Sequence, residues 1–79
     1  MPVHMNGLPS DMDKVMKIAR KHKLFVIEDC AQADGGSYKG KRLGSIGDVS
    51  EFSFNYWKII TCGEGGAVCT NNREIYERA

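Results

Sequence analysis

Apolar side chains recur along the first part of the chain with the period of a helix. The positions that carry them at this spacing are Met12, Val15, Met16 and Ala19. Basic residues occupy the positions between them, so the pattern predicts an amphipathic helix over residues 11–22. Ser10 stands three residues before Asp13 in an arrangement like a capping box, which predicts that the helix begins here.

Strand patterns follow in three segments: Leu24–Ile27, Val49–Phe54 and Gly66–Thr70. The first is a continuous apolar run that ends abruptly at Glu28-Asp29, which predicts a strand covered on both faces. The second alternates, and the third follows the turn signal Gly63-Glu64-Gly65. We expect the first two strands to be parallel neighbours in one sheet.

The remaining segments predict connections and one further helix. They are an extended stretch at 2–5, a turn at Asn6-Gly7, a glycine-rich loop at 35–48 with a hairpin around Lys39-Gly40, and a helix over 73–79 capped by Asn71 or Asn72. This order of elements predicts part of an α/β sheet that is incomplete at both ends. We therefore expect an internal slice of a longer protein.

Composition narrows the classes of function. The 79 residues carry 11 Lys and Arg against 10 Asp and Glu, so a net charge of +1 gives no electrostatic case for a nucleic acid or an anionic membrane. The cysteines at 30, 62 and 69 cannot all pair, which predicts a reducing cytoplasm. No apolar run approaches the roughly 20 residues that span a bilayer. His4 and His22 lack partners at a zinc-like spacing, so we expect no metal site.

Two polar residues follow the first predicted strand. Asp29 stands at its carboxyl end, where open α/β sheets place their ligands. A buried carboxylate there needs a cation, and a protonated pyridine nitrogen would provide one. With equal weight, Asp29 could cap the turn at Ala31-Gln32. Gln32 has donors and an acceptor that could approach the same ligand, or it could be an ordinary polar loop residue.

Two further candidates lie on and after the second strand. Ser53 stands between Phe52 and Phe54, so its hydroxyl faces away from those rings and could donate to a phosphate, although a small strand residue is the simpler interpretation. Lys58 follows among apolar neighbours. A lysine in such a setting loses its charge more readily, and its neutral amine can attack an aldehyde. The competing interpretation is a lysine with its head in water.

In their order along the chain, these motifs resemble one known family. They are Val26-Ile27-Glu28-Asp29-Cys30-Ala31-Gln32-Ala33, the glycine-rich stretch with Gly44 and Gly47, Phe52-Ser53-Phe54, Lys58 and Gly63-Glu64-Gly65-Gly66. Together with His4, Gly7 and Asp11-Met12-Asp13, they are similar to the DegT/DnrJ/EryC1/StrS aminotransferases over essentially all 79 residues. Asp34 is a departure, since many members carry His or a similar residue at this position.

The resemblance implies a fold, a cofactor and a reaction. The fold would be part of the large domain of a fold-type I, aspartate-aminotransferase-like enzyme, and the cofactor pyridoxal 5'-phosphate. Glutamate or glutamine would be the amino donor, and a keto sugar, commonly nucleotide-linked, the acceptor. By position, Asp29 would pair with the pyridine nitrogen, Gln32 would contact the ring and its hydroxyl, and Ser53 would bind the phosphate. Lys58 would hold the cofactor covalently and move the substrate proton. A lysine at position 58 also argues against membership of a dehydratase branch of the family, which carries His at this position.

Family members are several times longer than this chain. The resemblance therefore implies that residues 1–79 are a fragment of the large domain, without the upstream phosphate-binding segment or the small domain. The parent would be a homodimer, and the isolated fragment would be inactive. The alternative is a non-catalytic truncated gene product or an assembly segment. A nucleotide-binding α/β module unrelated to this family would need a glycine fingerprint directly after a strand, which the sequence lacks.

Overall fold

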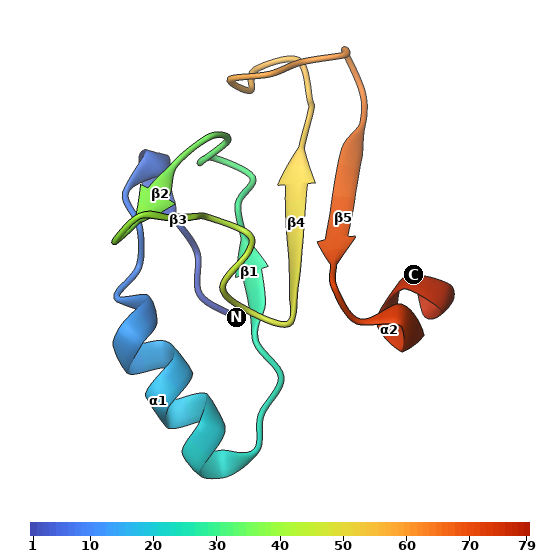
Figure 1. The fold of residues 1–79 in the computed structure, drawn as a ribbon. Coiled ribbons are helices and arrows are strands. Elements are labelled where there is room, and N and C mark those ends of the chain that lie inside the picture. The colour runs from blue at the N-terminus through green and yellow to red at the C-terminus, as the bar shows by residue number, and fades with distance from the viewer.

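The computed structural model describes all 79 residues as a three-stranded sheet with helices and a hairpin around it (Figure 1). The elements are η1 (Met5–Gly7), α1 (Met12–His22), β1 (Ile27–Asp29), β2 (Ser37–Tyr38), β3 (Lys41–Arg42), β4 (Val49–Ser53), β5 (Gly66–Thr70) and α2 (Arg73–Arg78). No helix is long and apolar enough to cross a membrane. All three cysteines are free thiols.

The sheet has the order β1-β4-β5. Strands β1 and β4 are parallel, as expected, with Asp29 in register with Glu51, whereas β5 runs antiparallel to β4. The predicted extended stretch at 2–5 contributes only a single parallel bridge between Val3 and Asp29. The carboxyl ends of β1 and β4 point toward the same edge of the sheet, where the long loop between β4 and β5 also lies (Figure 1).

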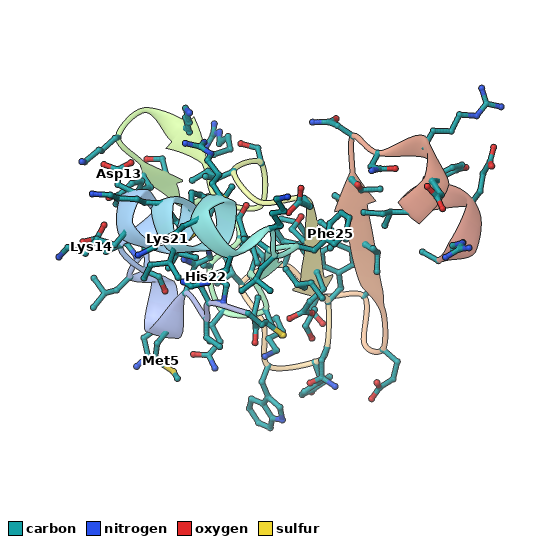
Figure 2. All side chains as sticks on the ribbon, turned by 90° about the horizontal axis from the view of Figure 1, so that it is seen from below. Met5, Asp13, Lys14, Lys21, His22 and Phe25 are labelled. Atoms are coloured by element: carbon teal, nitrogen blue, oxygen red, sulfur yellow. The ribbon has the colours of Figure 1, made fainter.

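The helix predicted from the apolar period is confirmed, with a different cap. In α1, Met12 and Ala19 are buried. The Asp11 side chain, rather than that of Ser10, accepts the Lys14 N–H at 3.2 Å and caps the helix. Ser10 is engaged elsewhere, because its hydroxyl donates to the carbonyl oxygen of Val3 at 2.8 Å. In Figure 2 the labelled side chains of Lys14, Lys21 and His22 lie on this helix, and all three are exposed.

The first strand begins later than predicted and is not covered on both faces. β1 starts at Ile27, and within the apolar run only Val26 is buried. Leu24 is 60% exposed and Phe25 is 74% exposed. Phe25 lies between α1 and the β5–α2 side of the molecule (Figure 2) and borders a hollow with Asn72 on the α2 side. The apolar run is therefore largely the connection into the strand.

The turns and the last helix follow their local chemistry. Lys39 and Gly40 have φ values of 47° and 81°, the left-handed pair that a tight hairpin between β2 and β3 requires. The predicted hairpin is confirmed.

β4 ends at Ser53, one residue short of the prediction. The Asn72 side chain accepts two backbone N–H groups at the start of α2 and is one of the two caps that the sequence indicated.

Two small clusters of buried side chains form the core. One is Met12, Ala19 and Val26, and the other is Cys30, Ala33 and Leu43. Tyr38 and Ile46 pack against both clusters and so join them. The hairpin that carries Tyr38 is fixed to α1, because the Tyr38 hydroxyl donates to Asp11 at 3.1 Å and Lys39 pairs with Asp13.

A fully buried carboxylate connects the separate parts of the chain. Glu28 has no exposed surface, and its oxygens accept the backbone N–H groups of Gly44, Ile46 and Gly47. His4, also fully buried, donates from Nε2 to Glu28 at 3.1 Å. Nδ1 of His4 accepts the Ser10 N–H at 3.1 Å, which fixes the tautomer with its proton on Nε2.

Burial and hydrogen bonding act in opposite directions on this carboxyl. Burial raises the pKa of Glu28, but the N–H donors of Gly47 and Gly44, the His4 ring and the Ile46 N–H together lower it below its ordinary value of 4.5. The carboxylate is therefore kept ionised inside the protein. It ties the N-terminal segment, β1 and the loop at 44–47 into one unit.

We predict that Glu28→Gln lowers the free energy of unfolding by about 3 kcal/mol, because the amide cannot accept all of the surrounding donors. Urea denaturation followed by circular dichroism measures the change. Glu64→Gln is the matched control, since Glu64 is exposed, and it should shift stability by less than about 0.5 kcal/mol. Equal stabilities for the two variants would contradict the assigned role of Glu28.

Stability should also fall in acid in a way that depends on Glu28. Its folded pKa lies below the ordinary 4.5, so the unfolded chain takes up the proton first as the pH falls through that value. The contribution is fully present above that pH and is lost progressively below it. Urea denaturation at a series of pH values should give a shallower acid loss in Glu28→Gln than in the wild type. Parallel curves for the two proteins would refute the linkage.

Candidate active site

The sheet has two chemically different faces at the ends of β1 and β4. Residues in register on neighbouring strands point to the same face, and alternate residues along a strand share a face. Asp29, Glu51 and Ser53 therefore lie on one face. Glu28 and Ser50, in register with each other, lie on the opposite face, where both are fully buried. The polar residues of the first face are half-buried and make up the candidate site.

Asp29 and Glu51 form a pair of carboxyl groups. Oδ1 of Asp29 accepts the Ala31 N–H at 3.0 Å, so this side chain does cap the following turn. Burial raises the pKa of Glu51, the neighbouring Asp29 carboxyl raises it further, and the positive charge of Lys58 lowers it. This cap uses only one oxygen of Asp29 and leaves the other free of that turn. Asp29 can therefore cap the turn and also pair with a protonated ring nitrogen.

Gln32 and Lys58 line a common cleft. The cleft has a volume of about 520 Å³ and is bordered by Asn6, Ala31, Gln32, Trp57, Lys58 and Ile59. Oε1 of Gln32 accepts the Asn6 N–H at 3.0 Å, which holds the side chain against η1. The amide nitrogen of Gln32 makes no hydrogen bond within the chain, so its two donors are available to a ligand.

Lys58 is half-buried in the loop between β4 and β5 and makes no ion pair. Its backbone N–H donates to the carbonyl oxygen of Asn55 at 3.0 Å, in a turn that begins just after the strand. The apolar setting expected around it is absent in this chain. Trp57 is 87% exposed and Ile59 is 68% exposed, because the loop extends beyond the sheet (Figure 1).

Ser53 faces away from the ring of Phe52, as the alternation of the strand predicts. Phe52 packs against the cluster of Cys30, Ala33 and Leu43, on the side of the sheet opposite Ser53. The Ser53 hydroxyl oxygen accepts the Asn55 N–H at 3.4 Å. Backbone hydrogen bonds of Phe54 with residues 62 and 65 close the loop that follows. The strand and this closed loop thus hold Ser53 and Lys58 at one edge of the sheet.

The structure brings the four sequence candidates together in two pairs. Gln32 and Lys58 share the cleft, whereas Asp29 and Ser53 share a sheet face and do not line the cleft. The charge of Lys58 acts on Glu51, which links the two pairs. Sequence reasoning missed Glu51. The strand alternation that oriented Ser53 also puts residue 51 on the same face and would have found it.

A second cluster of titratable groups lies on the buried side. Ligand-type atoms of His4, Glu28 and Cys30 lie within 4.8 Å of one another. Both ring nitrogens of His4 are already hydrogen-bonded, to Ser10 and Glu28. Burial, with a smaller contribution from Glu28 and other carboxylates, raises the pKa of the Cys30 thiol to about 12. Both oxygens of Glu28 are occupied as well, by the N–H groups of Gly44, Ile46 and Gly47, so we assign this cluster to the core.

Comparison with known proteins identifies the same family that the sequence motifs resemble, over the whole length of the chain. The model of the DegT/DnrJ/EryC1/StrS aminotransferase family matches residues 1–79. The chain is 53% identical to a GDP-perosamine synthase of Escherichia coli O157:H7 over 99% of this chain and 21% of that protein. It is 51% identical to a dTDP-3-amino-3,6-dideoxy-alpha-D-galactopyranose transaminase of Aneurinibacillus thermoaerophilus, over 99% of this chain and 22% of that protein.

The fold agrees with this identification. An aminotransferase of Psychrobacter cryohalolentis superimposes with a TM-score of 0.91 at 53% identity, over 94% of this chain and 19% of that one. The expected α/β fold, that of a fold-type I aminotransferase, is confirmed. The chain spans about a fifth of the length of the relatives that it matches. It belongs to the DegT/DnrJ/EryC1/StrS aminotransferase family.

Proposed function

We propose that the protein containing this chain is an aminotransferase that uses pyridoxal phosphate to transfer an amino group to a keto sugar. The observation that carries the proposal is a cleft lined by Lys58 and Gln32 beside the paired carboxyl groups of Asp29 and Glu51. The names of the GDP-perosamine synthase and the dTDP-sugar transaminase support a nucleotide-linked sugar as the acceptor. Glutamate or glutamine is the proposed donor.

The side chains at the site fit this cofactor chemically. The half-buried carboxyl groups of Asp29 and Glu51 supply negative charge for a protonated ring nitrogen. Lys58 has an amine without an ion-pair partner, suited to attach to an aldehyde carbon. Gln32 has free amide donors for the ring hydroxyl, and Ser53 has a hydroxyl for the phosphate.

The proposed chemistry divides between the cofactor and the chain. When bound, pyridoxal phosphate withdraws electrons and so makes the carbon next to the amino nitrogen acidic. Asp29 would hold the cation on the ring nitrogen, and Ser53 would orient the phosphate. Lys58 would bind the cofactor and, as a free neutral amine, would move the proton at the acidic carbon. The turn that Asp29 caps keeps its carboxyl in a fixed orientation for this role.

We further propose that residues 1–79 are part of the large domain and do not turn over substrate alone. Only 9 of the 79 residues are buried, and apolar side chains such as Phe25 and Trp57 are exposed. A parallel pair such as β1 and β4 usually has cover on both faces. In the parent protein, further segments and the second subunit of a homodimer would supply that cover and complete the site. The competing interpretation is a non-catalytic gene product with the same fold.

Lys58 should capture the cofactor in preference to other lysines. Pyridoxal phosphate is added to the 79-residue chain, borohydride fixes it to whichever amine it occupies, and peptide mass spectrometry locates the label. We expect about tenfold more label on Lys58 than on the exposed helix residue Lys17, a ratio equivalent to about 1.4 kcal/mol of added binding. In Lys58→Ala the remaining lysines should label evenly. Equal labelling of Lys58 and Lys17 in the wild type would contradict the proposed role.

A hybrid enzyme tests whether the chain can perform the reaction in a complete protein. Residues 1–79 replace the matching segment of the E. coli GDP-perosamine synthase, and formation of GDP-perosamine is measured. We expect activity in the hybrid and a loss of more than about a hundredfold with Lys58→Ala, because the proton-moving amine is removed. Matching thermal unfolding of the two hybrids excludes misfolding. A folded but inactive wild-type hybrid would favour the non-catalytic interpretation.

A further inference from the structure

Glu51 lies at the centre of the candidate site although no motif pointed to it. It is half-buried on β4, in register with Asp29 on β1 and two residues before Ser53 on the same strand. Cross-strand neighbours in register stand about 5 Å apart at Cβ. The side chain of Glu51 is therefore the nearest β4 neighbour of the Asp29 side chain on that face of the sheet.

The groups that surround Glu51 determine what its charge can do. Asp29 on β1 contributes a second carboxyl, and Lys58 in the loop contributes a positive charge. On the other side, β5 presents only the apolar side chain of Val68 in register with it. The nearby Cys30 thiol stays protonated, since burial raises its pKa to about 12. The chain itself thus offers one cation, Lys58, to two carboxyl groups.

A ligand with a cationic ring would balance this charge. Two adjacent carboxylates repel each other, and burial makes the repulsion stronger. Condensation of the Lys58 amine with an aldehyde, as in the proposed function, releases water and leaves an imine nitrogen, a much weaker base than the amine, so the pair loses most of that positive charge. A protonated ring nitrogen beside Asp29 would then be the remaining cation available to both carboxyl groups.

We propose that Glu51 is a positioning residue that acts through Asp29 and strengthens the binding of a cationic pyridine ring. The inference rests on the proposed function, because it needs the cofactor ring to meet Asp29. When Glu51 is ionised, the ring nitrogen is attracted by two negative charges. When Glu51 is protonated, only Asp29 attracts it. The preference for a cationic ring therefore increases as the pH rises through the ionisation of Glu51.

Two probes isolate the contribution of the ring nitrogen. One is pyridoxal phosphate, and the other is its benzene analogue, which keeps the aldehyde, hydroxyl and phosphate but has C–H in place of the ring nitrogen. The dissociation constants of both for the hybrid synthase that carries residues 1–79 are measured across pH. Any effect of pH on the Lys58 amine acts on both probes and cancels in their ratio.

Wild type should favour pyridoxal phosphate over the analogue, and Glu51→Gln should reduce this preference by about threefold to tenfold. Binding of the analogue should change less than that of pyridoxal phosphate, because only an effect of Glu51 on the Lys58 amine reaches it. The pH dependence of the ratio should disappear in Glu51→Gln and return in Glu51→Asp. An equal loss for both probes would indicate a merely structural role and would overturn the proposal, as would no change for either. If neither probe binds the folded hybrid, the proposed function itself fails.

A titration of the unliganded chain gives an independent test. Carbon-13 NMR follows the side-chain carboxyl of Glu51. Its pKa should lie above the ordinary 4.5, fall in Asp29→Asn, and rise in Lys58→Ala. These opposite shifts are a signature of electrostatic coupling that altered packing alone would not produce. A Glu51 pKa at the ordinary 4.5 that neither substitution changes would overturn the inference while leaving the role of Lys58 intact.

Discussion

The buried carboxylate of Glu28 determines where the rest of the structure can lie. An ionised group without solvent must be surrounded by donors, and here the donors come from His4 and from the loop at 44–47. Because successive strand residues face opposite sides, the inward orientation of Glu28 forces Asp29 to the other face. The position of the candidate site is thus a consequence of a hydrogen-bond network that lies behind it.

The glycines of the loop are required by the same network. A Cβ on Gly47 would lie 2.8 Å from the Val26 carbonyl oxygen, so a larger residue would push the loop away from Glu28. Gly44 has a φ of +88°, and a Cβ there would lie 2.5 Å from the Phe52 ring. Only glycine lets these backbone N–H groups approach the carboxylate closely. A segment that reads as flexible loop in the sequence is therefore a closely packed part of the structure.

The sequence predicts correctly those elements that depend only on residues close together in the chain. The period of α1, the left-handed pair Lys39-Gly40 and the Asn72 cap each depend on neighbouring residues alone. The predicted start of β1 is wrong because apolar character does not by itself mean burial. The hydrogen bonds of Glu28 and the pairing with β4 define that strand. The sequence pattern predicts Ser10 as the cap because the hydrogen bonds of Ser10 with Val3 and His4 are not visible in a linear sequence. For the same reason, the adjacency of Asp29 and Glu51 emerged only from strand register.

The position of Trp57 gives the molecule an intrinsic fluorophore at one defined place. It is the one tryptophan of the chain, and it lies on the wall of the cleft next to Lys58 with most of its indole in solvent. Its emission therefore comes from a single place, the mouth of the candidate site. A ligand that fills the cleft would contact this indole, so a change in intrinsic fluorescence is the expected sign of its binding, without a background from other indoles.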